Sequence, residues 1–375
     1  MNDVLMAIRK EKDNIDSLMT GDKLIIYGAG NFGKDVFHAA VRKGLSIIAF
    51  LDQNAKPGRH YEGIPVLRPD NSSIPANEKA NIPIFLAVHN RDVELFPIIS
   101  LLKTLGYLNV LTPVVFYDLL GDQLGNRFWL TNRSYYLQYE DAIREGFSVW
   151  ADDTSRNLYR QVLKYRVTGD YDLPPMPDLK CQYVSTDIPS WKTPLRFVDC
   201  GAFDGDTIRK FIELGIHIQA VAAFEPDENN FRALSFFVRE RLKALNDITL
   251  WPCAVYSATN RKPFFSGVGE SAKLSDAGSA TVQCVSLDDV IPYFRPNLIK
   301  MDIEGAEYDA LLGAKQTIVE NIPGLAICVY HQPDDLWRIP LLVQRWGCEY
   351  EFYLRQHAYN GFDLVMYGVK GQPDN

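Results

Sequence analysis

The sequence lacks the cysteine patterns of metal, redox or disulfide-stabilised proteins. Its six cysteines are scattered, and no two form the Cys-x-x-Cys pair of a zinc or redox site. With 375 residues, the chain can also bury a core without the disulfide framework of small secreted domains. We therefore expect reduced cysteines that belong to the core.

Clustered basic charge is also lacking. The chain has 39 Lys and Arg against 47 Asp and Glu, for a net charge of -8, and no dense basic run. Binding to nucleic acid needs clustered Lys and Arg to neutralise phosphates. The composition therefore argues against a nucleic-acid partner and favours a small-molecule or glycan acceptor.

Long apolar runs and targeting segments are missing as well. No stretch has the roughly 18 uninterrupted apolar residues that a membrane-spanning helix needs. Residues 1–12 mix acidic and basic side chains and contain no apolar segment of a signal peptide. We expect a cytoplasmic protein without a membrane span. Residues 3–20 have the spacing of an amphipathic helix, which covers either the core or a partner subunit, so a homodimer is left open.

The patterns that are present indicate an α/β protein with two Rossmann-like domains. Strands alternate with helices in both halves, which is typical of mostly parallel sheets. We predict a nucleotide- or nucleotide-sugar-binding domain over residues 1–120, a helical connector and proline-rich linker over 121–194, and a second domain over 195–375 that ends in an antiparallel hairpin. The second domain is expected to have strands at 195–199, 219–224, 248–254, 297–302, 325–330 and 362–369, and helices at 206–214, 228–243, 306–320 and 335–346.

The most informative motif follows the first strand of the second domain. The run Asp199-Cys200-Gly201-Ala202-Phe203-Asp204-Gly205-Asp206-Thr207 joins this strand to a helix, and Glu225 ends the next strand twenty residues after Gly205. An acid at that offset holds ribose hydroxyls in nucleoside-binding βαβ units. The turn lacks a third glycine and carries carboxylates, which disfavour a dinucleotide's phosphates. S-adenosylmethionine, which is cationic and has no phosphate, fits better.

We predict that the ends of these strands bind the cofactor. The glycines permit close approach, Asp199 or Asp204 can pair with the ammonium, and Glu225 can accept hydrogen bonds from both ribose hydroxyls. The alternative is a purely structural turn that Asp206 or Thr207 caps. The predicted cofactor-binding residues are Asp199, Gly201, Ala202, Asp204, Gly205, Asp206, Thr207 and Glu225, with Ala254 and Val255 lining the adenine slot after the third strand.

A second acidic segment follows a later strand. An apolar run over 298–301 leads into Asp302, Glu304 and Glu307. Carboxylates this close repel one another, which an arrangement selected for stability alone would avoid. Such a cluster can hold an acceptor, act as a general base or bind a divalent metal ion through oxygen. We predict that Asp302 and Glu304 are catalytic and that Glu307 only favours the start of a helix.

His331 is the third predicted catalytic residue. It leaves the strand expected beside that of Asp302, and an ordinary histidine pKa would suit it to take a hydroxyl proton. A satisfied structural histidine is the alternative. His357, expected in a hairpin at the same edge, is a weaker candidate.

Together, four ordered motifs resemble the FkbM family of S-adenosylmethionine-dependent methyltransferases over about residues 195–370. The family has the class I methyltransferase fold and is associated with O-methylation of sugars, polyketides and related natural products. The resemblance implies cofactor contacts at Asp199, Gly201, Asp204, Gly205 and Glu225, and leaves the acceptor, the base and any metal open. The motifs are Val198–Thr207, Phe224-Glu225-Pro226-Asp227, Lys300–Glu307, and Tyr330-His331-Gln332-Pro333 with Asp335-Leu336.

The first domain carries a glycine turn of its own. Gly28-Ala29-Gly30-Asn31-Phe32-Gly33 follows a short apolar strand, and Asp52 ends the next strand nineteen residues after Gly33. With Gly63-Ile64-Pro65-Val66, this segment resembles the nucleotide-sugar-binding N-terminal domain of bacterial sugar acyltransferases. The resemblance implies a second nucleotide site at Gly28, Gly30, Gly33 and Asp52, and a purely structural fold is the alternative.

Two other functions stay open beside a methyltransferase that O-methylates a hydroxyl of a sugar, polysaccharide precursor or related natural product. One is an NAD(P)-dependent nucleotide-sugar oxidoreductase or epimerase that uses residues 20–120. No Tyr in the chain has a Lys four residues later, the pair that a short-chain reductase would use. The other is a non-catalytic nucleotide-sugar-binding protein.

Overall fold

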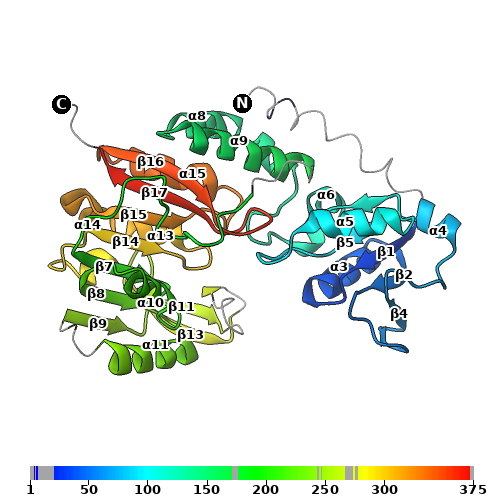
Figure 1. The fold of residues 1–375 in the computed structure, drawn as a ribbon, viewed down its shortest axis with the longest axis horizontal. Coiled ribbons are helices and arrows are strands. Elements are labelled where there is room, and N and C mark those ends of the chain that lie inside the picture. The colour runs from blue at the N-terminus through cyan, green and yellow to red at the C-terminus, as the bar shows by residue number, and fades with distance from the viewer. Residues whose placement is uncertain are drawn as a thin grey trace. The chain divides into compact units, whose positions relative to one another are not determined.

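The chain forms two compact units (Figure 1). The computed structural model describes residues 21–170, 176–242, 245, 247–266, 273–274 and 278–371, together with Val4 and Met6. The helix predicted over residues 3–20 therefore lies almost wholly outside the described residues. The first unit comprises Met1–Phe147, Asn157–Pro177 and Ala358–Phe362, and the second comprises Ser148–Arg156, Asp178–His357 and Asp363–Asn375.

The sheet of the first unit has six strands in the order β3-β4-β2-β1-β5-β6. Its described pairings are parallel except that between β3 and β4. The central strands are apolar and buried, as expected when helices cover both faces of a parallel sheet. The elements are β1 Lys23–Tyr27, α3 Asn31–Arg42, β2 Ser46–Leu51, β3 His60–Tyr61, β4 Ile64–Leu67, α4 Ala76–Asn81, β5 Ile84–Leu86, α5 Leu95–Thr104, β6 Val110–Leu111 and α6 Pro113–Leu124, followed by α7 Ser134–Leu137, α8 Glu140–Ser148 and α9 Asp153–Thr168.

A short loop from near the C-terminus completes the first unit. The side chain of Asn360 donates hydrogen bonds to the carbonyl oxygens of Asn90 at 2.8 Å and Val93 at 2.7 Å. The indole N–H of Trp129, a residue only 1% exposed, donates to the carbonyl oxygen of Asn360 at 3.1 Å. The loop therefore belongs to the unit formed mainly by the N-terminal part of the chain.

The sheet of the second unit has seven strands in the order β16-β17-β15-β14-β7-β8-β9. Strand β17 runs antiparallel to both of its neighbours, whereas the pairings from β15 to β9 are parallel. The predicted mostly parallel sheet with an antiparallel C-terminal hairpin is thus confirmed. The elements are β7 Leu195–Cys200, α10 Asp206–Glu213, β8 Ile218–Phe224, α11 Glu228–Arg241, β9 Asp247–Trp251, β14 Leu298–Met301, α13 Glu307–Leu312, α14 Lys315–Asn321, β15 Gly324–Cys328, α15 Asp335–Gln344, β16 Tyr350–Gln356 and β17 Leu364–Lys370.

A small second sheet, ordered β10-β13-β11-β12, was not predicted. It corrects the expected position of Ala254 and Val255, because the third strand of the main sheet ends at Trp251 and both residues lie in β10, which pairs with β13. The helix predicted over 306–320 is divided at Gly313, where a Cβ would lie 2.2 Å from the carbonyl oxygen of Tyr256. The elements are β10 Ala254–Val255, β11 Asn260–Phe265, β12 Lys273–Leu274, β13 Ala280–Val285 and α12 Leu287–Val290.

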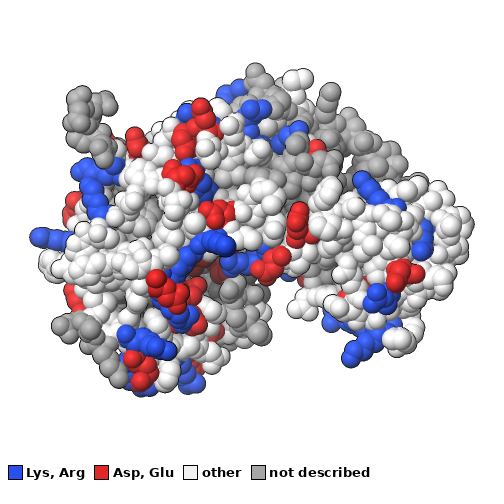
Figure 2. All heavy atoms as spheres, viewed as in Figure 1, with Lys and Arg blue, Asp and Glu red and all other residues white. Residues whose placement is uncertain are grey.

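The described surface carries mixed charge. On the face shown in Figure 2, basic and acidic side chains are interspersed, and neither sign forms a continuous surface there. In the part of the chain that the structure describes, every helix is too short or too polar to cross a bilayer.

Candidate functional site

The turn after β7 depends on two glycines in the left-handed region. Gly201 has a φ of 77° and Gly205 a φ of 89°. A Cβ on Gly201 would lie 2.0 Å from the carbonyl oxygen of Asp302, and one on Gly205 would lie 2.6 Å from a ring carbon of Phe237. Both glycines are therefore required for the turn to pack against its neighbours, and their predicted contact with a cofactor remains a proposal.

A buried ion pair between neighbouring strands supports this turn. Lys300 on β14 pairs in register with Asp199 on β7, and its Nζ lies 3.1 Å from Oδ1 of Asp199 and donates to the carbonyl oxygen of Gly201 at 2.6 Å. Burial raises the pKa of Asp199 to about 6 although Lys300 opposes the shift. Burial acts to lower the pKa of Lys300, but the carboxylate of Asp199 raises it on balance.

This pairing gives Asp199 a buried partner that was not predicted. The residue is 0% exposed, and its contact with a cofactor stays a prediction. It acts on the turn through Lys300, a residue that the sequence analysis did not assign. The sequence feature that could have identified Lys300 is a single cation in an otherwise apolar strand. A buried cation needs a buried partner.

Glu225 lies directly after β8, as predicted, and its carboxylate reaches the turn. One oxygen accepts the N–H of Phe203 at 2.9 Å and the other accepts the N–H of Asp227 at 2.8 Å. Burial raises the pKa of Glu225 to about 7, against the effect of these two hydrogen bonds. Glu225 is 5% exposed, and each of its carboxylate oxygens can accept a second hydrogen bond, so its contact with vicinal hydroxyls stays a prediction.

The other predicted cofactor residues divide into exposed and buried groups. Asp204 pairs with Arg209 at 3.4 Å, and Asp206 opens α10, where its carboxylate accepts the N–H of Thr207 at 2.7 Å. Thr207 is 2% exposed and Ala202 is fully buried, so their side chains pack in the core, and their contact with a cofactor stays a prediction. Ala254 and Val255 are also buried in β10.

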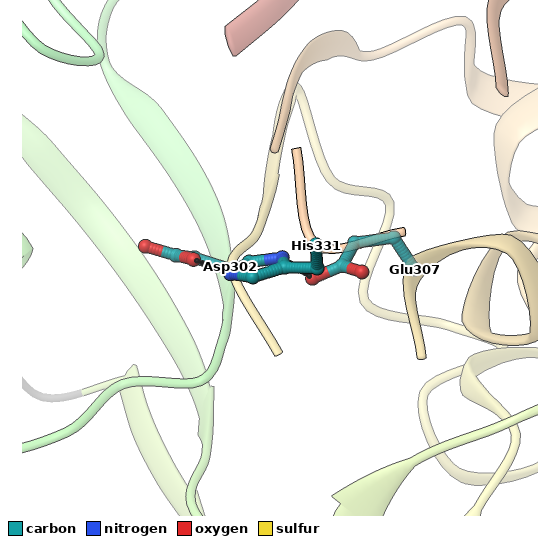
Figure 3. Close-up of side chains that lie close together, drawn as sticks. All are labelled: Asp302, Glu307 and His331. Carbon is teal, nitrogen blue, oxygen red and sulfur yellow. Dashed lines mark ion pairs between the residues drawn. The ribbon is translucent and has the colours of Figure 1, made fainter. Parts of the chain in front are cut away.

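Asp302, Glu304, Glu307 and His331 form what we call the acid–imidazole cluster. Nε2 of His331 lies 3.4 Å from Oδ1 of Asp302 and 3.9 Å from Oε2 of Glu304, and its Nδ1 lies 2.8 Å from Oε1 of Glu307. Figure 3 shows the imidazole between Asp302 and Glu307. Strands β14 and β15 are paired, which confirms the predicted adjacency of the segments that carry Asp302 and His331.

Glu307 has a larger role than was predicted. Its side chain is 0% exposed, and its carboxylate accepts the N–H groups of Ile303 at 2.8 Å and Gly305 at 3.1 Å in addition to contacting His331. The prediction that Glu307 only favours the start of a helix is therefore wrong. The residue fixes both the loop after β14 and the orientation of the imidazole.

The expected ordinary pKa of His331 is also wrong. Burial acts to lower the pKa, but the carboxylates of Glu307, Glu304 and Asp302 raise it to about 10. The three carboxylates therefore favour the protonated imidazole, which counts against His331 as the base. For Asp302, burial acts to raise the pKa, but Lys300 and His331 lower it on balance, so this carboxylate is ionised.

Tyr183 belongs to the site and was missed. Its hydroxyl donates to Oδ2 of Asp302 at 2.8 Å. The backbone of Tyr183 has a φ of 66°, its N–H donates to the hydroxyl of Tyr367 at 2.8 Å, and its carbonyl accepts the indole N–H of Trp191 at 2.7 Å. Nothing in the spacing of the proline-rich linker indicated this contact, which spans 119 positions of the chain.

We expect Tyr183→Phe to destabilise the protein by about 1.5–3 kcal/mol, because a hydrogen bond to an ionised carboxylate is lost. Chemical denaturation of the variant and the wild type measures the difference. Tyr353→Phe is the matched control, since that hydroxyl contacts Glu351 at an exposed position. Equal losses in the two variants would contradict the role given to Tyr183.

His357 is a structural residue. Its Nδ1 lies 2.8 Å from the carbonyl oxygen of Asp178 and its Nε2 lies 2.8 Å from the hydroxyl of Tyr367. Burial lowers its pKa, which keeps the ring neutral. With both nitrogens engaged, His357 is not available as the weaker candidate base of the sequence analysis.

The glycine turn of the first unit has open space at one position. Cβ atoms on Gly28 and Gly33 would lie 2.8 Å from the carbonyl oxygen of Ala87 and 1.9 Å from that of Gly28, whereas a Cβ on Gly30 would meet no described atom within 4 Å. Asp52 follows β2, and its carboxylate accepts the N–H of Asn54 at 2.8 Å in a local turn. Gly28 and Gly33 thus serve packing, and only Gly30 faces open space.

Comparisons with known proteins match both halves of the chain. Residues 199–354 match the methyltransferase FkbM domain, and residues 23–93 match the PglD N-terminal domain. The crystal structure of a methyltransferase FkbM from Methylobacillus flagellatus KT is 22% identical and has a TM-score of 0.82 over 98% of each chain. This likeness confirms the fold.

Two further solved structures are only distantly similar. Fibrillarin from Aeropyrum pernix, with bound S-adenosyl-L-methionine, is 13% identical over 48% of this chain and 67% of its own, with a TM-score of 0.26. A Streptococcus mutans protein in complex with SAH is 14% identical over 48% of this chain and 90% of its own, with a TM-score of 0.27. Such TM-scores are too low to relate the folds. No curated protein matches the chain.

Proposed function

We propose that this protein uses S-adenosylmethionine to methylate a hydroxyl group, because residues 199–354 match an FkbM methyltransferase domain and residues 23–93 match a PglD N-terminal domain. The proposed acceptor is a sugar, a polysaccharide precursor or a related natural product. A nucleotide-linked form of that sugar is proposed to bind the N-terminal domain. A cytoplasmic location and a homodimer stay predictions.

The cofactor proposal depends mainly on the position and contacts of Glu225. Backbone N–H groups hold its carboxylate beside a turn with two left-handed glycines, at the ends of two parallel strands. Nucleoside ligands of such sheets bind outside the carboxyl ends of the strands, with an acid on the ribose hydroxyls. The arrangement supports an adenosine group at this edge.

Methyl transfer requires mainly that the acceptor hydroxyl be aligned with the methyl group of the cofactor. In an in-line displacement, a C–O bond forms to the acceptor as the S–C bond breaks, so that the sulfonium becomes a neutral thioether and the hydroxyl loses its proton. The carboxylates around His331 favour its protonated form, which makes it a poorer acceptor for this proton. Asp302 and Glu304, whose side chains are 23% and 19% exposed, are the groups we propose to receive the acceptor hydroxyl and its proton.

The proposal is tested by calorimetry with S-adenosylhomocysteine, together with mass spectrometry of any ligand that copurifies. We expect S-adenosylhomocysteine to bind and NADH to give no fluorescence change on titration. Binding of NADH without S-adenosylhomocysteine would instead favour the oxidoreductase or epimerase. A nucleotide sugar as the only ligand would favour the non-catalytic binding protein.

A nucleotide-sugar site in the first unit is supported by cations beside its glycine turn. Arg59 donates to the carbonyl oxygen of Ala29 at 3.4 Å, and the guanidinium of Arg127 lies 4.7 Å from the ring centre of Phe32. Helix α3 begins at this turn and has no acidic residue in its first turn. Guanidinium groups and a helix N-terminus both favour phosphate. Calorimetry with UDP-glucose, compared with glucose alone, tests the site.

The affinity for S-adenosylhomocysteine should depend on pH through Glu225. Its pKa of about 7 means that the carboxylate form, which accepts from both hydroxyls, declines below pH 7. We expect about tenfold tighter binding at pH 8 than at pH 6, measured by calorimetry. In Glu225→Gln, this pH dependence should disappear.

Stability provides an independent check on the same pKa. Because burial raises the pKa of Glu225 above its ordinary value of 4.5, the folded state holds this proton more tightly than the unfolded state. The contribution of Glu225 to stability therefore falls as pH rises from about 4.5 to 7. Denaturation of the Glu225→Gln variant should lack this decline, and an identical pH profile in both proteins would contradict the raised pKa.

A further inference from the structure

We propose that the acid–imidazole cluster binds a first-row divalent cation through Nε2 of His331 and one carboxylate oxygen each from Asp302 and Glu304. The donors come from two neighbouring strand ends. An imidazole nitrogen with two carboxylate oxygens is a donor set suited to Mn²⁺ or Zn²⁺, whereas Ca²⁺ requires six to eight oxygens.

The spacing of the donor atoms fits coordination better than hydrogen bonding. Nε2 of His331 lies 3.4 Å from Oδ1 of Asp302 and 3.9 Å from Oε2 of Glu304. A charge-assisted hydrogen bond from imidazole to carboxylate is about 2.7–2.9 Å long. An ion held at about 2.1 Å places its ligand atoms roughly 3.0–3.4 Å apart, so Nε2 of His331 and Oδ1 of Asp302 already have this spacing, whereas Oε2 of Glu304 must come closer to Nε2.

Glu307 orients the imidazole toward the proposed ion. Its Oε1 lies 2.8 Å from Nδ1, which is the length of a charge-assisted hydrogen bond, and its side chain is fully buried. Histidines that bind metals commonly donate their second ring N–H to a carboxylate, which directs the other ring nitrogen to the ion. Figure 3 shows Glu307 and Asp302 on opposite sides of the ring, as this arrangement requires.

Asp302 is fixed in a matching way. The hydroxyl of Tyr183 donates to Oδ2 of Asp302, so that Oδ1 is the oxygen that faces the imidazole. Both proposed carboxylate ligands retain some exposed surface, whereas the side chain of His331 is 1% exposed. An ion at this place is therefore held from the buried side and has coordination positions left for an oxygen ligand from outside.

The charges of the cluster also call for a cation. Three carboxylates surround one imidazole, and the nearby cation Lys300 lies 3.1 Å from Asp199, donates to the carbonyl oxygen of Gly201 and also lowers the pKa of Asp302. A single imidazolium offsets only one of the three negative charges. A divalent ion that takes the place of the proton on Nε2 balances the cluster more nearly and relieves the repulsion between the carboxylates.

The ion would also take part in the proposed methyl transfer, and this inference rests on the proposed function. A hydroxyl bound to the cation has a lowered pKa and loses its proton to solvent more readily. The cation would supply this lowered pKa, and the C–O bond to the acceptor would form as the S–C bond of the sulfonium breaks. With the ion bound, the three proposed ligands would position the acceptor, and the proton that Asp302 or Glu304 receives in the ion-free proposal would pass to solvent instead.

The test is a titration of the full chain with MnCl₂, followed by electron paramagnetic resonance, after dialysis against EDTA. We expect one Mn²⁺ ion to bind per chain. Asp302→Asn and Glu304→Gln should each weaken binding by at least about 100-fold, and Glu307→Gln by about 10–100-fold. The control is Glu228→Gln, since this glutamate is 77% exposed on α11, and it should bind Mn²⁺ like the wild type.

The following results would contradict the proposed ion site. Failure of the wild type to bind Mn²⁺, Zn²⁺ or Mg²⁺, or unchanged binding in both ligand variants, would overturn it. Glu304→Gln alters a partly exposed side chain, so it keeps the test decisive if Asp302→Asn does not fold. Calorimetry with S-adenosylhomocysteine on the same samples tests the proposed cofactor site separately from the ion site. The ion can bind when S-adenosylhomocysteine does not, and S-adenosylhomocysteine can bind when the ion does not.

Discussion

Replacing Lys300 by methionine is expected to destabilise the protein by about 3–5 kcal/mol, because removal of one partner leaves a charge buried without compensation. Nζ of Lys300 lies 3.1 Å from Asp199, and the two side chains are 3% and 0% exposed. The same Nζ holds the carbonyl oxygen of Gly201 at 2.6 Å, so the glycine turn loses a support as well. Chemical denaturation measures the loss.

Two further variants show whether the uncompensated charge is the cause. In Lys300→Met combined with Asp199→Asn, both charges are gone, so we expect part of the lost stability to return. Lys315→Met alters an exposed lysine at the start of α14 and should change stability by less than about 0.5 kcal/mol. A double variant that is less stable than Lys300→Met alone would contradict the explanation.

Glu225→Ala is expected to weaken binding of S-adenosylhomocysteine by at least about 100-fold. Two hydrogen bonds from ribose hydroxyls to a carboxylate contribute about 3–6 kcal/mol together, and each 1.4 kcal/mol changes the affinity tenfold. Calorimetry of both proteins at pH 8 measures the difference, because the carboxylate is ionised there.

Loss of structure must be separated from loss of the ligand contact. The N–H groups of Phe203 and Asp227 lose their acceptor in Glu225→Ala, which loosens the turn. Glu225→Gln retains a carbonyl oxygen and similar volume, so it should bind with intermediate affinity. If Glu225→Ala stays folded and binds as the wild type does, the proposed cofactor site is wrong.

The parts of the site that follow strand ends could be predicted from the sequence. Glu225, Asp302 and His331 each stand just beyond a buried apolar strand, and parallel strands bring such residues to one edge of a sheet. The glycines of the turn could be predicted because they directly follow a buried strand in the sequence. Local patterns sufficed here because strand periodicity and the order of strands and helices fix which end of each strand meets the helices.

Contacts between distant segments could not be predicted in this way. Tyr183 reaches Asp302 from an irregular linker, whose path depends on packing rather than on periodicity. The short strand β10 has only two residues, too few to show alternation, so Ala254 was assigned to the wrong sheet. The pKa of His331 also depends on three carboxylates that meet only in the folded chain.

The loop that completes the first unit limits how this protein can be dissected. Residues 358–362 lie between β16 and β17 in the chain but supply Asn360 to the carbonyl oxygens of Asn90 and Val93. An N-terminal fragment that ends at the linker would leave these acceptors open and uncover one side of Trp129, whose indole N–H would lose its acceptor. Producing the N-terminal domain by itself therefore requires grafting this pentapeptide or redesigning the surface it protects.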